Sequence, residues 1–151
     1  MAGKETRGVE HAEGSLFQGR PYVLTEREPE LMAWVERIGA KLVILSAGEH
    51  DHLVAVSSHL PQMLSVALAG MIGDENGASS VAGPGAIDMT RLAMSSYDIW
   101  HDILSTNQGP IDAALSAFIL RLESLRRSLG APHMGRHFQE ASGTALSLRK
   151  G

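Results

Sequence analysis

The chain has 151 residues, which is enough for one medium domain, or for one domain and part of another, with a buried core. Thirteen basic and 17 acidic residues give a formal net charge of -4, so we expect no basic surface for nucleic acid. Cysteine is absent, which excludes disulfides, thiolate metal sites and cysteine nucleophiles. The N-terminus is too polar for a signal peptide, and we expect no apolar run of the roughly 18 residues that a membrane span needs. We therefore expect a cytoplasmic protein.

The first elements in chain order form a predicted β-α-β unit. A short strand is expected at residues 22–25 and a second, buried strand at 41–45. Between them, Pro29 stands near the first turn of a helix and Gly39 just after its end, an asymmetry typical of helix boundaries. The unit is too small to be a domain, because its apolar strands need more sheet beside them. We expect residues 1–47 to be the last part of an α/β domain.

From Gly48 onward the apolar periodicity becomes helical, so residues 48–151 are expected to form a mainly helical domain. Glycine, serine and proline mark the breaks between its helices. The expected elements are, in order, a long helix at 50–72 bent at Pro61, a loop at 73–86, short helices at 88–94 and 96–106, and a helix at 110–130.

The last of these helices has the most regular pattern. Its apolar residues recur at alternating intervals of four and three, the spacing of a coiled-coil-like seam. Such a seam needs a partner helix, either in the same chain or in a second subunit, and periodicity does not decide between the two. The residues after Pro132 are weakly patterned. The seam consists of Ile111, Leu115, Phe118, Leu122, Leu125 and Leu129.

Residues able to do chemistry gather in two places. The first is the start of the long helix, where His50, His52 and His59 lie close in sequence. We expect no zinc site there, because His52 and His59 are two helical turns apart and no carboxylate completes an H-E-x-x-H pattern. The second place holds Arg91, on an otherwise apolar short helix. Such an arginine is either an ion-pair partner or a clamp for a ligand.

The chain resembles the prephenate/arogenate dehydrogenase family. Several short motifs occur in the same order as in that family and with similar spacings. They are EHD at 49–51, SHLP at 58–61, DMTRLA at 88–93, Trp100 and Asn107. Residues 1–5 (MAGKE), with 16–17 and 22–25, resemble the segment that follows the catalytic His-Pro of that family. The resemblance covers nearly the whole chain. It implies the C-terminal remnant of a Rossmann-type nucleotide-binding domain followed by a helical substrate-binding and dimerisation domain.

The resemblance also implies an activity, which is the NAD- or NADP-dependent oxidation of prephenate or arogenate, with loss of carbon dioxide, in tyrosine biosynthesis. The sequence contains neither the catalytic histidine of the family nor its Gly-rich dinucleotide fingerprint. The histidine would precede Met1, so we expect the chain to be inactive by itself. The residue that selects NAD or NADP follows the fingerprint, so the choice between them stays open.

Roles for individual residues follow from the resemblance. Arg91 would bind a substrate carboxylate through two parallel hydrogen bonds. Ser58 and His59 would line the pocket; the alternatives are a serine bonded to its own helix and a buried core histidine. Asp88 could pair with Arg91 or cap its helix, and we expect the cap. Trp100 would either wall the pocket or belong to the core.

Two further positions concern substrate recognition. Glu5, beside the missing His-Pro, would lie at the cleft. Many prephenate-specific relatives read SHLPH, whereas this chain has Gln62 at the last position. A glutamine donates and accepts hydrogen bonds but cannot become cationic, so we expect a shift toward arogenate.

A second class of function remains open at this point, which is a helical module for dimerisation or small-ligand binding. The two classes predict different geometry. In the enzyme, Arg91, His59 and Ser58 converge on one concave pocket, and in the module they point to unrelated surfaces.

Overall fold

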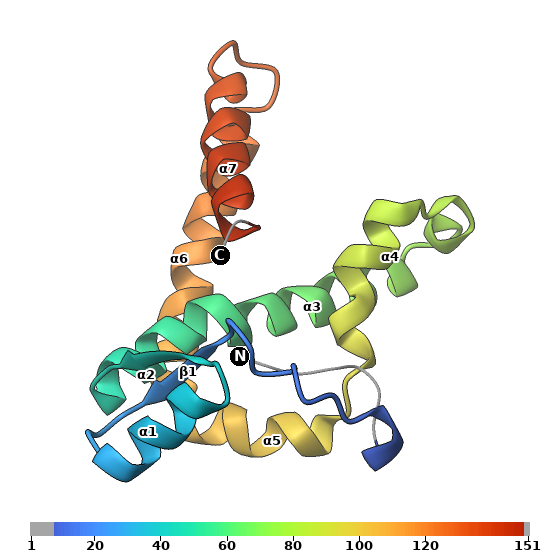
Figure 1. The fold of residues 1–151 in the computed structure, drawn as a ribbon. Coiled ribbons are helices and arrows are strands. Elements are labelled where there is room, and N and C mark those ends of the chain that lie inside the picture. The colour runs from blue at the N-terminus through green and yellow to red at the C-terminus, as the bar shows by residue number, and fades with distance from the viewer. Residues whose placement is uncertain (1–7, 150–151) are drawn as a thin grey trace. The chain divides into compact units, whose positions relative to one another are not determined.

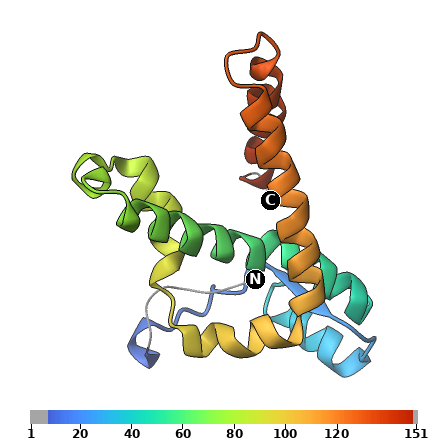
Figure 2. The ribbon, with the colours of Figure 1, turned by 180° about the vertical axis from the view of Figure 1, so that it is seen from behind.

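The computed structural model describes residues 8–149, and Figures 1 and 2 show its ribbon from opposite sides. Contacts within the chain divide it into two compact units, one ending at His59 and the other beginning at Leu60. The chain is mainly α-helical with one small parallel sheet near its N-terminus, so the predicted fold class is confirmed. The predicted domain boundary at residue 47 lies earlier, at the start of the long helix.

The first unit contains the predicted β-α-β unit: β1 (Pro21–Leu24), α1 (Pro29–Arg37) and β2 (Lys41–Ile44), after a short 3-10 turn, η1 (Val9–His11). The two strands pair in parallel, with Tyr22 opposite Leu42. Pro29 occupies the first turn of α1, where its fixed φ suits the helix. Gly39 has a φ of 75°, a conformation that favours glycine. Val35, only 2% exposed, is the residue of α1 that the unit buries most fully.

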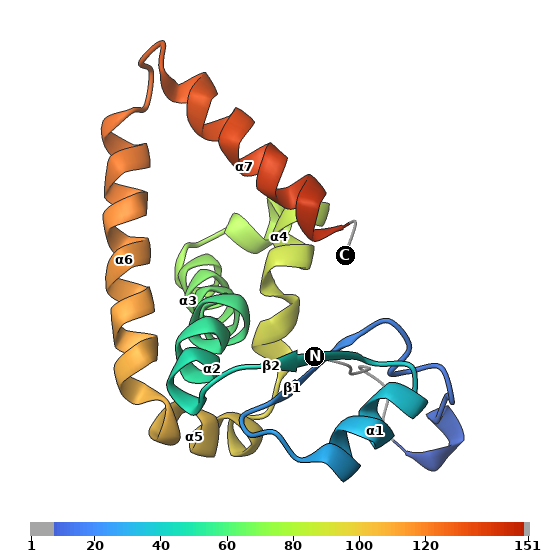
Figure 3. The same ribbon diagram turned by 60° about the vertical axis from the view of Figure 1, so that its left-hand side comes forward.

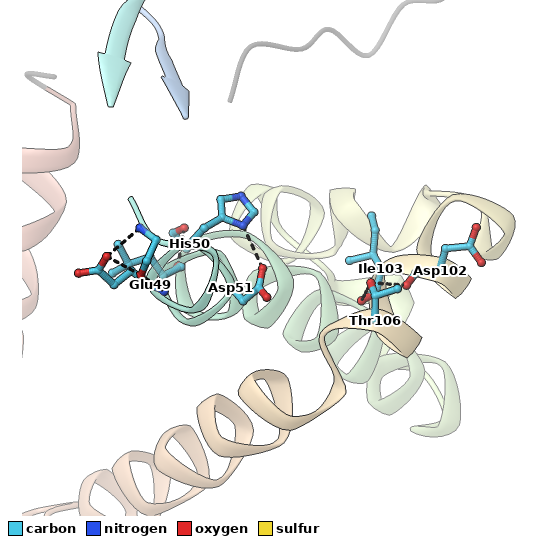
Figure 4. A network of polar contacts seen from close by, with 9 residues as sticks. Glu49, His50, Asp51, Asp102, Ile103 and Thr106 are labelled. Atoms are coloured by element: carbon cyan, nitrogen blue, oxygen red, sulfur yellow. Dashed lines mark hydrogen bonds and ion pairs between the residues drawn. The ribbon is translucent and has the colours of Figure 1, made fainter. Parts of the chain in front are cut away.

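The long helix runs from Ala47 to Asp74 in three segments: α2 (Ala47–Val54), a π-helical turn η2 (Ala55–His59) and α3 (Leu60–Asp74). It begins earlier than predicted because Ser46 caps it. The Ser46 hydroxyl accepts the Glu49 N–H at 3.3 Å, and the Glu49 carboxylate accepts the Ser46 N–H at 2.8 Å, which is a capping box. Figure 4 shows Glu49 folded back in this way. The Ser46 hydroxyl also donates to the Glu49 carboxylate at 2.6 Å, and this bond, together with the one from the Ser46 N–H, lowers the pKa of the Glu49 carboxyl.

The π-helical turn stands immediately before Pro61, the residue at which the sequence predicted a bend. Proline has no N–H to donate and its ring clashes with the preceding turn of a regular helix. A widened turn that places extra backbone before the proline relieves that clash. Ser57, Ser58 and His59 all lie in this turn.

This helix also corrects one expectation about composition. With 28 residues and a mean hydropathy of 1.3 in its most apolar window, it is long and apolar enough to cross a membrane by those two measures alone. The prediction that no apolar run reaches that length was therefore wrong. It failed because His59, three serines, Pro61 and Gln62 interrupt the apolar residues between Leu53 and Gly73, where no lysine, arginine, aspartate or glutamate occurs.

The second unit is helical. After α3 it contains η3 (Ala78–Val81), α4 (Pro84–Thr90), η4 (Arg91–Met94), α5 (Tyr97–Thr106), α6 (Gln108–Arg127) and α7 (Met134–Leu148). Within it, α3 packs against α4 and η4, and α6 packs against both α3 and α5. The helix expected at 88–94 begins at Pro84 instead, because the Gly83-Pro84 pair, interpreted as part of a loop, places proline in its first turn. Asp88 therefore lies inside α4, and the prediction that it caps the helix was wrong.

The seam of α6 is buried at one end only. Ile111 is buried inside the unit and Leu115 is half-buried, whereas Leu122 is 49% exposed and Leu129 is 70% exposed. The weakly patterned tail forms α7, which runs back from the turn at 128–133 and diverges from α6 (Figure 3). The N-terminal end of the seam thus finds its partner in the same chain, and the C-terminal end presents leucines on the surface.

Candidate functional site

The first group of candidate residues lies in the π-helical turn of the first unit. Ser58 is half-buried there and His59 is 8% exposed. The neighbouring Ser57 hydroxyl donates to the Leu53 carbonyl at 2.8 Å, the local bond typical of serine inside a helix. Turns of this kind break the regular hydrogen-bond ladder of a helix and occur often at functional sites.

The surroundings of His59 favour its neutral form. Burial lowers the pKa of its imidazole, the nearby His50 lowers it further, and the Asp51 carboxylate partly opposes both effects. His50 Nδ1 lies 3.0 Å from the Asp51 carboxylate (Figure 4). A neutral imidazole can donate one hydrogen bond and accept another, so His59 is suited to hydrogen bonding rather than to binding an anion by charge.

The second group belongs to the second unit. Arg91 is the first residue of η4 and is exposed, Asp88 is exposed on α4, and Trp100 is half-buried on α5. None of the ion pairs found among residues 8–149 joins Asp88 to Arg91. The Thr90 hydroxyl before Arg91 donates to the Ala86 carbonyl at 2.8 Å and so belongs to the helix. The guanidinium is the cation of this group.

Gln62 is placed differently from a surface ligand contact. Its side chain is 3% exposed, and its amide nitrogen donates to the Leu92 carbonyl in η4 at 2.9 Å. Ser65, one turn further along α3 and 2% exposed, accepts the Ala93 N–H at 3.0 Å. Sequence reasoning missed Ser65. The available signal was a serine spaced three residues from Gln62 in an otherwise apolar stretch of helix.

The remaining candidate residues are divided between the two units, apart from Glu5. Glu5 and the other opening residues of the family resemblance lie outside the described residues. Ser58 and His59 belong to the first unit, and Gln62, Asp88, Arg91 and Trp100 to the second. Their convergence on one pocket stays a prediction.

A dinucleotide fold binds phosphates at the first β-α turn of its domain, at the N-terminus of the helix that follows. The β1–α1 turn is the β-α turn that the described residues contain. This turn has no glycine, and the Glu28 carboxylate accepts the Glu30 N–H at 3.3 Å, so an acidic side chain occupies the N-terminus of α1. A negative charge there repels a pyrophosphate, so the turn does not fit NAD or NADP. Within the described part of the chain, no three histidine, aspartate or glutamate side chains are grouped to hold a metal ion.

Comparison with known families identifies the helical region. The family model described as "Prephenate dehydrogenase, dimerization domain" matches residues 46–140. The chain is 30% identical over 164 residues to cyclohexadienyl dehydrogenase from Zymomonas mobilis, covering 99% of this chain and 56% of that protein. It is 34% identical over 111 residues to prephenate dehydrogenase from Lactococcus lactis, covering 71% of this chain and 31% of that one. The chain thus spans about half, or less, of the length of these curated relatives.

Solved structures agree with these sequence matches. Synechocystis arogenate dehydrogenase has a TM-score of 0.82 and 28% identity, over 97% of this chain and 59% of that one. Prephenate dehydrogenase from A. aeolicus, in complex with hydroxyphenyl propionate and NAD+, has a TM-score of 0.85 and 25% identity, over 98% of this chain and 57% of that one.

The lowered pKa of His59 predicts how stability depends on pH. The imidazole binds a proton more weakly in the folded chain than in the unfolded chain, where its pKa is near 6.5. The free energy of unfolding should therefore be highest above pH 6.5 and fall as the pH drops through 6.5 toward the lowered value. Urea denaturation at a series of pH values measures this dependence.

A His59→Gln variant should flatten the dependence of the free energy of unfolding on pH. His101→Gln, which removes an exposed histidine, is the control. An unchanged slope in His59→Gln contradicts the assignment.

Proposed function

The chain belongs to the prephenate dehydrogenase family, and from that premise we propose that it supplies the substrate-binding residues and the dimer interface of a prephenate/arogenate dehydrogenase. The observation that carries the proposal is the match of the dimerization-domain model to residues 46–140, because this range contains the π-helical turn and the helices around Arg91. The proposed reaction oxidises a cyclohexadienol with loss of carbon dioxide and yields an aromatic ring.

Recognition of the substrate is assigned to three side chains. Prephenate carries two carboxylates, so its site needs a fixed cation, and a guanidinium can bind one carboxylate through two parallel hydrogen bonds. We assign that role to Arg91. Ser58 and the neutral His59 would hydrogen-bond other oxygens of the substrate, which fits the half-buried and buried positions of these two residues in the π-helical turn. Trp100 would wall the pocket beside the ring, and Asp88 would lie at its edge.

The cofactor is proposed to be NAD or NADP, which supplies the hydride acceptor when bound. We assign no phosphate contact to the β1–α1 turn, because Glu28 already occupies the N-terminus of α1. The chain alone is therefore expected to give no reduced cofactor when incubated with NAD+ and prephenate, as followed by nicotinamide absorbance. Turnover by the isolated chain would show that a hydride-transfer site exists within it.

The proposed role of Arg91 predicts a loss of ligand binding. An Arg91→Ala variant should bind hydroxyphenyl propionate, the ligand of the A. aeolicus relative, at least about tenfold more weakly, because a hydrogen bond to a charged group contributes about 1.5–3 kcal/mol. Isothermal titration calorimetry measures this, with Arg136→Ala as a control for an exposed arginine. The uncharged amide of the same ligand should bind both proteins equally. Equal binding of the carboxylate by wild type and Arg91→Ala would refute the assignment.

The same titration addresses the expected preference for arogenate. The Gln62 amide nitrogen donates one hydrogen bond to Leu92, and the amide stays uncharged whatever else it contacts. The ratio of prephenate to arogenate affinity should rise in a Gln62→His variant, since an imidazole can become cationic. An unchanged ratio would remove the preference from the proposal.

We also propose a homodimer formed through the helical unit. Leu122 and Leu129 of the seam are exposed, and a groove between α6 and α7 is lined by Leu125, Ala141 and Leu148 together with charged side chains, Arg121 and Glu140. Exposed apolar area of this kind is typical of a surface covered by another protein. The exposed apolar residues of α7 are Phe138, Leu146 and Leu148.

The dimer proposal predicts a change in mass. Wild-type chain should elute as a dimer in size-exclusion chromatography with light scattering, and a Leu122→Glu, Leu129→Glu double variant should elute as a monomer, because it places two charges in the seam. Ser116→Glu adds a charge at an exposed polar position of the same helix and should stay dimeric. A monomeric wild type, or a dimeric double variant, would contradict the proposed interface.

A membrane partner is not part of the proposal, although the long helix is apolar. Gln62 and Ser65 are buried in that helix and hydrogen-bonded to the backbone of η4, which is how a helix packs against protein. We propose that the chain works in the cytoplasm. In the alternative function, a stand-alone dimerisation or ligand-binding module, Arg91→Ala would leave carboxylate binding unchanged while the dimer persisted.

A further inference from the structure

Helix α3 holds the short turn η4 by two hydrogen bonds from its side chains. Gln62 donates to the Leu92 carbonyl at 2.9 Å, and Ser65 accepts the Ala93 N–H at 3.0 Å. The two side chains lie three residues apart, on the same face of α3, and both are almost fully buried. Their backbone partners are consecutive residues. We call Gln62 and Ser65 the α3 anchor.

A hydrogen bond from a buried side chain to a distant segment restricts the position of that segment. Each anchor bond connects positions that are about 30 residues apart in sequence, so it fixes tertiary rather than local structure. The Leu92 carbonyl also accepts the Ser95 N–H at 3.0 Å, so both lone pairs of this oxygen are used. The middle of η4 is therefore tied to a helix of 15 residues by groups that solvent does not reach.

Arg91 immediately precedes the two anchored residues. We propose that Gln62 and Ser65 are positioning residues, which fix the backbone that carries Arg91 so that its guanidinium meets a substrate carboxylate in the bidentate orientation. This inference rests on the proposed function of Arg91. It gives Ser65 a role that no sequence motif assigned, and it makes Gln62 act through Arg91 rather than only through direct contact.

The physical reason is the geometry that a bidentate pair requires. Two parallel N–H···O bonds need the guanidinium plane aligned with the carboxylate, and an arginine side chain has several rotatable bonds between that plane and its Cα. A fixed Cα position and Cα–Cβ direction reduce the conformations that binding has to select. A 3-10 turn of four residues has few hydrogen bonds of its own to provide this rigidity, and the regular helix α3 supplies it.

A double-mutant cycle on the full chain tests the proposal. The variants are Ser65→Ala and Gln62→Met, each made with Arg91 and with Ala at position 91, and the probe is hydroxyphenyl propionate titrated by calorimetry. Either anchor variant should weaken binding about three- to tenfold when Arg91 is present. The same variant should have no further effect when Arg91 is replaced by alanine. Ser105→Ala is the control, because it removes an exposed hydroxyl that donates to a backbone carbonyl at 3.0 Å.

Hydrogen exchange provides a second measurement that stays informative if one variant folds poorly. The Ala93 amide should exchange faster in Ser65→Ala, whereas the amides of α6 should keep their wild-type rates. Loss of affinity by the same factor with and without Arg91 would overturn the proposal, since the anchor would then act on the general fold. Full affinity in both anchor variants would overturn it as well. If Arg91→Ala itself binds normally, the proposed function of Arg91 fails and the inference fails with it, a pattern distinct from the other two.

Discussion

The arrangement of the candidate site depends on one constraint, which is that polar side chains buried in an apolar helix each need a partner. The helix Ala47–Asp74 buries His59, Gln62 and Ser65 within two turns. Gln62 and Ser65 satisfy this constraint by bonding to the backbone of η4, and burial of His59 favours the neutral form of its imidazole. The polar residues of an apolar helix thereby determine which segment packs on it, and that segment begins with Arg91.

In the proposed site, Arg91 and His59 would have different electrostatic roles. An arginine keeps its charge at any pH that a protein experiences, so a carboxylate site built on Arg91 does not weaken as the pH rises. Charging a buried histidine would destabilise the folded protein, so the burial of His59 favours a hydrogen-bonding role. The fixed cation is exposed at the start of a short turn, where a ligand can reach it, and the neutral donor is buried in the long helix.

The sequence predicted those features that local signals specify. Pro29 and Gly39 marked the ends of α1, and the apolar runs beside them predicted the parallel strands, because proline and glycine act on the backbone at their own positions. It did not predict α7, because small and polar residues, glycine and serine among them, separate the large apolar residues of that helix, such as Phe138 and Leu148. The anchor residue Ser65 was missed for a different reason. Its bond to Ala93 joins segments 28 residues apart, and a polar residue in an apolar helix does not indicate which segment will bond to it.

The exposed leucines at the end of α6, together with the apolar residues of α7, affect how the protein folds, assembles and escapes degradation. If a second copy covers them, the folded state of this unit is linked to protein concentration, since association stabilises only the form that can associate. A newly synthesised chain would carry Leu129, Phe138 and Leu148 uncovered until it meets a partner. During that interval chaperones and proteases compete with assembly, so the rate of subunit encounter helps to set how much of the protein a cell retains.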